Sequence, residues 1–243
     1  MLSKTEEYTI TTNQLDKYDH VTIASALDLC QSIAGHHADD LGIGYENFIK
    51  ENKIWLIIGS KMTYLKHTKA PNKLKVVTYP LKPNSLHCER DYYIYDENND
   101  LCIKCTSKWV IYDFIKKRIN VCSNIMSGQE FIASRAYDEP LVKMNIDNMD
   151  EYKKVLTHEV TFTDLDHNGH FNNTRYCNLF YDIHPLEENE LINEIQVDYI
   201  NQCFMGDKLD VYVKEIENTY FLIGKVEMTP IFSLKITLNR LNG

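Results

Sequence analysis

An internal repeat constrains the fold of this chain more than any other feature of its sequence. Residues 8–21 align with residues 158–171 at an offset of 150, with identities at Thr11/Thr161, Leu15/Leu165, Asp16/Asp166 and His20/His170. Farther along, an offset of 135 matches Tyr64/Tyr199, Lys73/Lys208, Leu74/Leu209 and Val76/Val211. Two ungapped matches in the same order, whose offsets differ by one 15-residue insertion, indicate that one structural unit occurs twice.

Both copies predict the same order of secondary structure. Each begins with a β-rich stretch, residues 8–13 and residues 158–163. In the first copy an apolar stripe at helical spacing then runs from Ile23 to Leu41 and stops at Gly42. In the second copy Asn172 or Asn173 can cap a helix whose apolar face is Tyr176, Leu179, Phe180 and Ile183, and Pro185 ends it.

Alternating stretches after each helix predict successive antiparallel strands. The expected strands are residues 54–65, 74–79, 86–96 and 101–113, and then 194–201, 209–216, 220–228 and 231–241. A helix followed by a strand meander, used twice, predicts an α+β protein of two helix-plus-antiparallel-sheet repeats, because each sheet must bury one face against its own helix. We expect the repeats at residues 1–130 and 156–243, joined by a charged, irregular linker at 131–155.

Composition excludes several functional classes. The 243-residue chain carries a formal charge of −9, which argues against general nucleic-acid binding. Its N-terminus is polar, and its longest uncharged apolar stretch, residues 54–59, is far below the roughly 18 residues that a membrane span needs. The seven cysteines are scattered and odd in number, so we expect free thiols and a cytoplasmic protein.

The loop at residues 164–173 concentrates polar side chains between an expected strand and an expected helix. Asp164, Asp166, Asn168 and Gly169 fall at positions 1, 3, 5 and 6 of a calcium-binding EF-hand loop. Position 12, where a bidentate glutamate should close the coordination, is Arg175, and the preceding flank is strand-like. Calcium binding is therefore a weaker interpretation than catalysis.

The catalytic interpretation of this loop rests on polar residues at every second position. Asp166, Asn168 and His170 would share one side of an extended segment just ahead of a helix N-terminus. Backbone amides there can hold an oxyanion while a carboxylate and an imidazole handle water and protons, which suits carbonyl chemistry. The alternative is a polar cap loop in which Asp166 and His170 only satisfy backbone groups.

These residues resemble a known family, the acyl-acyl carrier protein (acyl-ACP) thioesterases of plants and bacteria, which are built as two tandem hotdog domains. Residues 164–176 resemble the family's D-L-D-x-N-x-H-V-N-N-x-x-Y signature, and residues 197–203 resemble its L-E-Y-R-R-E-C segment. In the first half, residues 29–44 and the stretches around Trp55, Arg90 and Trp109 also fit. The resemblance implies a double hotdog that hydrolyses acyl-ACP thioesters to fatty acid and carrier protein, without a metal or cofactor.

The resemblance also implies a catalytic set of Asp166, Asn168, His170, Gln202 and Cys203. Gln202 stands where the family usually has a glutamate, and an amide cannot take a proton as a carboxylate can. Asp166 is then the better candidate to activate water or to attack the thioester, with His170 stabilising charge or moving protons and Asn168 orienting them. Cys203 is either a nucleophile paired with His170 or a small buried strand residue.

The first copy lacks part of this polar set and is expected to be non-catalytic. It has Tyr18 where the second copy has Asn168. The resemblance implies that this half supplies the acyl pocket, for which Trp55 and the apolar stripe are candidates, with plain core packing as the alternative. A double-hotdog hydratase or dehydratase is a further alternative, although that group spaces its residues D-x-N-x-x-H and this chain reads D-x-N-x-H. A non-catalytic acyl- or calcium-binding module also stays open.

A lysine-rich segment is the candidate docking face for an acidic carrier protein. Residues 61–88 contain no acid and carry +6, which leaves −15 on the rest of the chain. The lysines are Lys61, Lys66, Lys69, Lys73, Lys75 and Lys82. A solvated sheet edge is the alternative. The duplication already supplies a pair of hotdogs, so the oligomeric state is open and includes a homodimer.

Two other groups could bind a metal but lack a complete ligand set. Cys102 and Cys105 have no second pair at zinc spacing and would point to opposite faces of a strand. His36 and His37, with the acids at residues 39–40, have no third placed ligand.

Overall fold

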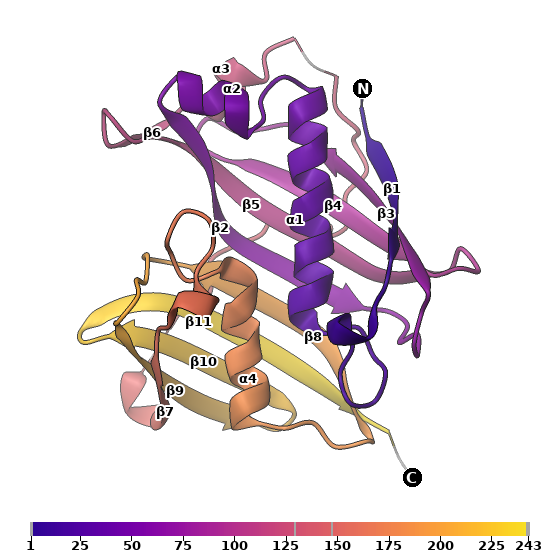
Figure 1. The fold of residues 1–243 in the computed structure, drawn as a ribbon, viewed down its shortest axis with the longest axis vertical. Helices are drawn as coiled ribbons and strands as arrows, with labels where there is room; N and C mark the ends of the chain where they lie inside the picture. The colour runs from indigo at the N-terminus through magenta and orange to yellow at the C-terminus, as the bar shows by residue number, and fades with distance from the viewer. Residues whose placement is uncertain (1, 129, 147, 242–243) are drawn as a thin grey trace. The chain divides into compact units, whose positions relative to one another are not determined.

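The computed structural model describes residues 2–128, 130–146 and 148–241 and divides into two compact units, Met1–Leu141 and Val142–Gly243. Each unit is an antiparallel sheet with helical segments on one face (Figure 1). No helix in the described part of the chain has the length and apolar character needed to cross a membrane.

The N-terminal unit has five strands in the order β1-β3-β4-β5-β2, with the short strand β6 on β5. Every pair is antiparallel. The strands are β1 (Lys4–Thr9), β2 (Lys53–Tyr64), β3 (Lys73–Pro80), β4 (Cys88–Tyr95), β5 (Leu101–Asp113) and β6 (Arg118–Asn120). The four strands predicted after the first helix are thus present, with ends shifted by at most two residues.

Helix α1 (Ile23–Asp40) crosses this sheet and packs on β1 and β3 (Figure 1). The Thr22 side chain caps it by accepting the Ser25 amide, and Gly42, at φ 72°, turns the chain away after its end. Its buried face carries the predicted apolar stripe. A six-residue helix, α2 (Tyr45–Lys50), was not predicted because it is too short to show helical periodicity. A further short helix, α3 (Cys122–Ile125), follows β6.

The C-terminal unit repeats the design with strand order β8-β11-β10-β9-β7. Its strands are β7 (Lys153–Glu159), β8 (Glu190–Tyr199), β9 (Lys208–Ile216), β10 (Thr219–Val226) and β11 (Thr229–Arg240). The order equals that of β2-β5-β4-β3-β1, and the register agrees as well. Tyr8 pairs with Leu74, and His158 pairs with Leu209, as the offsets of 150 and 135 require. The duplication read from the sequence is therefore structural.

The second helix is shorter than its counterpart. A 3₁₀ segment (Asn173–Cys177) precedes α4 (Asn178–Ile183), and Asn172 caps the segment by accepting the Thr174 amide at 3.0 Å. Pro185 follows the helix end, as predicted. The single continuous helix expected from the apolar face is replaced by these two pieces.

The predicted linker packs on both sheets. The Ala136 amide donates to Asp91 Oδ2 at 2.7 Å and the Leu141 amide to Glu89 at 3.0 Å, within the N-terminal unit. The Met144 amide donates to Asp198 Oδ2 at 2.7 Å in the C-terminal unit. Burial raises the pKa of both Asp91 and Asp198, and these amide bonds offset part of that cost.

Candidate active site in the C-terminal repeat

The polar loop is a tight hairpin turn and not the extended segment that alternation predicted. Leu165 bridges to Phe171, and the Asp166 amide donates to His170 O at 2.8 Å. Asp166 Oδ1 accepts the amides of Asn168 at 2.8 Å and His170 at 3.2 Å, which folds the chain back. Gly169 completes the turn at φ 78°, a backbone conformation that side-chain-bearing residues rarely adopt.

The segment before β9 brings the other predicted residues to this turn. The Phe171 amide donates to Cys203 O at 2.8 Å, and His170 forms an isolated bridge with Phe204. The Phe204 ring meets the His170 imidazole edge-on, with centroids 5.2 Å apart. Gln202 precedes these contacts and is exposed. Backbone pairing therefore gathers Asp166, Asn168, His170 and the pair Gln202–Cys203 in one region.

Asp166 and Asn168 also interact through their side chains. Asn168 Nδ2 lies 3.5 Å from Asp166 Oδ2, and Asn168 is exposed. One carboxylate oxygen of Asp166 thus organises the loop, while the other faces an amide at the loop surface.

Cys203 has the environment of a packing residue. Its side chain has no exposed surface, and burial, together with the charge of Asp207 and a hydrogen bond to it, raises the thiol pKa to about 12. Among the described residues no hydrogen bond joins its sulfur to His170. A thiolate at neutral pH is therefore disfavoured.

Replacing Cys203 by serine tests this assignment. We expect Cys203→Ser to keep at least about a tenth of the wild-type turnover, because a thiol that stays protonated and does not contact His170 is not the nucleophile. Turnover on a thioester substrate measures the effect. An acyl group trapped on Cys203 and detected by mass spectrometry would contradict the assignment.

Two neighbours of the site were not predicted from the sequence. Phe204 contacts His170, and Asp207 interacts with Cys203 and accepts the Phe204 amide at 2.8 Å. The first copy has the same backbone bridge, between His20 and Lys69, and the offset of 135 aligns Lys69 with Phe204.

The first copy builds the same turn around Asp16. Asp16 Oδ1 accepts the amides of Tyr18 at 2.8 Å and His20 at 3.0 Å, and the Asp16 amide donates to His20 O at 2.8 Å. Asp19, at φ 67°, takes the place of Gly169. The aspartate thus has a structural role in both copies, which is the role that the polar-cap alternative assigned to it. Among the predicted site residues the copies differ at three positions: Tyr18 matches Asn168, His67 matches Gln202 and Thr68 matches Cys203.

Comparisons with known proteins cover both repeats. Residues 2–128 match the family model of the acyl-ACP thioesterase N-terminal domain, and residues 147–240 match that of the C-terminal domain. The chain belongs to the acyl-ACP thioesterase family. The match places Asp16 and His20 in the N-terminal domain of this family, and Asp166, Asn168, His170, Gln202 and Cys203 in its C-terminal domain.

Solved structures of the family show the same fold. An acyl-ACP thioesterase from Bacteroides thetaiotaomicron has a TM-score of 0.86 and 18% identity, with 98% of each chain covered. The 12:0-ACP thioesterase from Umbellularia californica has a TM-score of 0.86 and 16% identity, covering 99% of this chain and 98% of that one. The predicted double hotdog is confirmed.

A curated relative is longer than this chain. The chloroplastic oleoyl-acyl carrier protein thioesterase of Coriandrum sativum is 21% identical over 229 residues, which are 86% of this chain. The chain spans 62% of the length of that relative.

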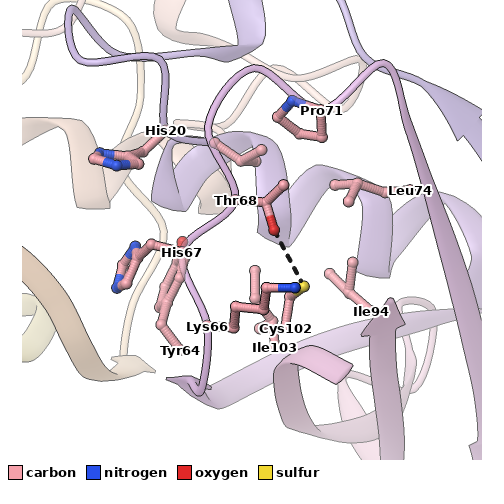
Figure 2. A pocket seen from close by; sticks show the side chains of 11 residues that line it. His20, Tyr64, Lys66, His67, Thr68, Pro71, Leu74, Ile94, Cys102 and Ile103 are labelled. Atoms are coloured by element: carbon pink, nitrogen blue, oxygen red, sulfur yellow. Dashed lines mark hydrogen bonds between the residues drawn. The ribbon is translucent and has the colours of Figure 1, made fainter. Parts of the chain in front are cut away.

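A small hollow with a cavity volume of about 20 Å³ lies in the N-terminal repeat. Figure 2 shows His20, His67 and Tyr64 on one side of it, and Leu74 and Ile94 on the other. The Tyr64 and His67 rings stack at 5.1 Å, and the imidazoles of His20 and His67 meet edge-on at 5.5 Å.

Two buried aromatic rings pack together in the C-terminal repeat at positions that match smaller residues of the N-terminal repeat. Tyr176 stacks on Phe171 at 4.5 Å, and both rings are buried. The offset of 150 puts Ala26 and Val21 at these two positions, and Val21 lines the hollow. The side chain that borders the hollow, Val21, is therefore smaller than the Phe171 ring at the matching position of the C-terminal repeat. Trp55, a candidate for a pocket lining, is partly buried, stacks on Phe48 at 5.3 Å and packs against a core cluster.

The calcium interpretation does not fit the contacts of its first ligand. Asp164 Oδ2 accepts the Thr161 amide at 2.8 Å and lies 2.9 Å from His158 Nε2, whereas Asp166 serves the hairpin turn. The carboxylates of Asp164 and Asp166 therefore bind different groups of the protein and do not converge on a common calcium position. In residues 2–128, 130–146 and 148–241, no three His, Cys, Asp or Glu side chains are grouped as a metal site needs.

In each of the two weaker candidate metal sites, the paired residues contact different partners. His36 Nδ1 lies 2.9 Å from Glu6, while His37 is buried and bonded to Arg90 at 3.0 Å. Cys102 contacts Thr68, and Cys105 contacts Cys30.

Proposed function

We propose that this chain hydrolyses fatty acyl-ACP thioesters to free fatty acid and carrier protein. The observation that carries the proposal is the match of both repeats to the domains of this family, together with the polar turn of the C-terminal repeat. In the reaction, water adds to the thioester carbonyl carbon and the carbon–sulfur bond breaks. The carrier leaves as a thiol.

Each residue of the turn has a proposed role. Asp166 shapes the loop through Oδ1 and activates water through Oδ2. His170 stabilises charge on the carbonyl oxygen or transfers a proton to the leaving sulfur. Asn168 orients the water and the carboxylate. Gln202, exposed beside Cys203, offers a hydrogen bond to the substrate but takes no proton.

Release of free thiol from an acyl-ACP by purified protein tests the activity. A thiol reagent added to the assay should show one thiol for each fatty acid formed. Hydration of an unsaturated acyl-ACP without thiol release would favour the hydratase alternative, and binding without turnover would favour the non-catalytic module.

The N-terminal repeat is proposed to be non-catalytic and to hold the acyl chain. The apolar side chains of Leu74, Ile94 and Ile103 on one side of its small hollow support this role, and the acyl chain would have to widen the hollow as it enters. The proposed domains are residues 1–130 and 156–243, with 131–155 between them.

Filling the hollow should change chain-length preference. Val21→Phe introduces the side chain that the C-terminal repeat has at this position, so it should remove space that a long acyl chain needs. We expect kcat/KM on long-chain acyl-ACP to fall about tenfold while the value for a short chain changes less than about threefold. A uniform change for all chain lengths would show that the hollow does not hold the chain.

The docking of the carrier protein on the lysine-rich segment also belongs to the proposal. Contacts within the unit neutralise part of this charge. Lys66 Nζ lies 2.7 Å from Asp96 and 2.6 Å from Asp100, and Lys73 lies 3.7 Å from Glu7. Lys61 and Lys75 lie over the rings of Tyr137 and Tyr95. Lys69 and Lys82 are exposed and form no ion pair among the described residues, so they are the better candidates for contact with an acidic partner.

Charge reversal at these two lysines tests the docking face. The double variant Lys69→Glu and Lys82→Glu should raise KM for acyl-ACP about tenfold, and the wild-type kcat/KM should fall as salt rises. Hydrolysis of an acyl-pantetheine thioester should change little. Lys50→Glu, at an exposed lysine outside the segment, is the matched control. Equal effects on both substrates would contradict the docking role.

The proposed compartment is the cytoplasm. All seven cysteines are free and buried, which suits a reducing environment.

A further inference from the structure

Three sulfur atoms meet in the core of the N-terminal unit. Cys88 begins β4, Cys122 begins α3, and Met126 follows α3 directly. Cys88 Sγ donates to Met126 Sδ at 3.8 Å, and Cys122, whose thiol donates to Leu86 O at 3.4 Å, packs in the same buried cluster. The three side chains are 5%, 0% and 3% exposed. Two thiols and a thioether therefore share one enclosed position.

The spacing suits a three-coordinate metal ion. When three sulfurs surround an ion at bond lengths of about 2.3 Å in a trigonal plane, they lie about 4 Å from one another. The 3.8 Å between Cys88 and Met126 is close to that separation. Cys122 and Met126 are four residues apart, and the Met126 amide donates to Cys122 O at 3.3 Å, so one helical turn directs both side chains to the same side.

Two thiols and one thioether favour a particular kind of metal ion. Calcium and magnesium prefer oxygen ligands, and structural zinc takes four ligands, whereas thiolate and thioether sulfur favour soft cuprous ion. Among the described residues no fourth His, Cys, Asp or Glu joins the group.

A buried positive charge lies on the same strand as Cys88. One cuprous ion on two thiolates and a thioether carries a net charge of −1, which is costly to bury without compensation. Arg90 lies two residues from Cys88 on β4, is 7% exposed, and its charge interacts with the Cys88 thiol. Its hydrogen bonds go to His37 Nδ1 at 3.0 Å and Thr78 Oγ1 at 3.4 Å, and no carboxylate in the described chain pairs with it. The guanidinium can therefore balance an anionic copper complex.

We propose that Cys88, Cys122 and Met126 form a binding site for one cuprous ion. Both thiols lose their protons to solvent on binding, and copper stays in the cuprous state. The same unit contains a competing group, because Cys30 and Cys105 are neighbouring buried thiols and the buried Met62 lies opposite Cys105 on β2.

Anaerobic titration of the reduced protein with cuprous ion, in competition with bicinchoninate, tests the site. We expect one ion per chain and an ultraviolet thiolate-to-copper absorption band. Met126→Leu preserves core volume and should weaken binding at least tenfold, and Cys122→Ser should weaken it further. Cys30→Ser, Cys177→Ser and Met62→Leu are matched controls at buried sulfurs and should leave the affinity unchanged.

Three results would overturn the proposal. The first is a wild-type protein that leaves all copper with bicinchoninate. The second is binding that persists in Met126→Leu but disappears in Cys30→Ser, with both proteins folded by circular dichroism. The third is a Cys88–Cys122 disulfide in place of bound copper, seen as the loss of two hydrogen masses.

Discussion

His170→Ala is expected to lower turnover of acyl-ACP by on the order of 10² or more without unfolding the protein. The imidazole is partly exposed at the turn, where backbone contacts with Asp166 and Phe204 hold its segment in place. These backbone contacts do not depend on the His170 side chain, so the variant should stay folded and its kcat should decrease. Steady-state kinetics and thermal unfolding measure the two effects.

His167→Ala is the matched control for this variant. His167 lies in the same loop and is exposed, and it has no proposed part in the reaction. We expect its kcat to stay within about threefold of wild type. If both histidine variants lose activity equally, the loop as a whole and not the His170 imidazole supports turnover.

Asp166→Asn is expected to cost a similar factor, on the order of 10² in kcat. The amide oxygen of asparagine can still accept the Asn168 and His170 amides, so the turn should keep its shape. The substitution therefore removes the negative charge with little change in geometry. A folded Asp166→Asn protein with wild-type turnover would remove Asp166 from the catalytic set.

Asp16→Asn separates the structural role from the chemical one. Asp16 makes the same two hydrogen bonds in the first copy. Both variants should therefore lower the free energy of unfolding by similar amounts, of order 1 kcal/mol. Only Asp166→Asn should lose activity by more than about tenfold. Equal losses of activity would show that the aspartate acts only through loop structure.

The repeat made most of the fold predictable from the sequence. Matching residues in the two copies, such as Leu74 and Leu209, occupy equivalent places in equivalent strands. Alternation over long strands and a capped stripe from Ile23 are strong signals because burial of one face repeats over many residues. Because this alternation is clear in every strand of the two meanders, all eight strands were located to within a few residues.

Local turn chemistry was harder to predict. Residues 8–13 and 158–163 were expected as strands, but the strands end at Thr9 and Glu159. Thr11 with Gln14, and Thr161 with Asp164, form capping boxes that start 3₁₀ turns. Residues 166–170 were expected to be extended, but the Asp166 side chain accepts the Asn168 and His170 amides and folds this segment into a turn.

The hollow and the sulfur cluster depend on contacts between distant parts of the chain. Val21 lines the hollow together with residues of β3, β4 and β5, and no local pattern brings these together. Cys88 and Met126 likewise approach across 38 positions of sequence. Such sites become visible only once the strands are paired.

A single-turnover reaction of wild-type protein with acyl-ACP in water labelled with heavy oxygen tests the central claim most directly. Mass spectrometry of the products should show free fatty acid carrying one labelled oxygen, together with an equal amount of carrier thiol. Intact thioester that has gained one water across its acyl chain, or intact thioester with no label, would contradict hydrolysis by this chain.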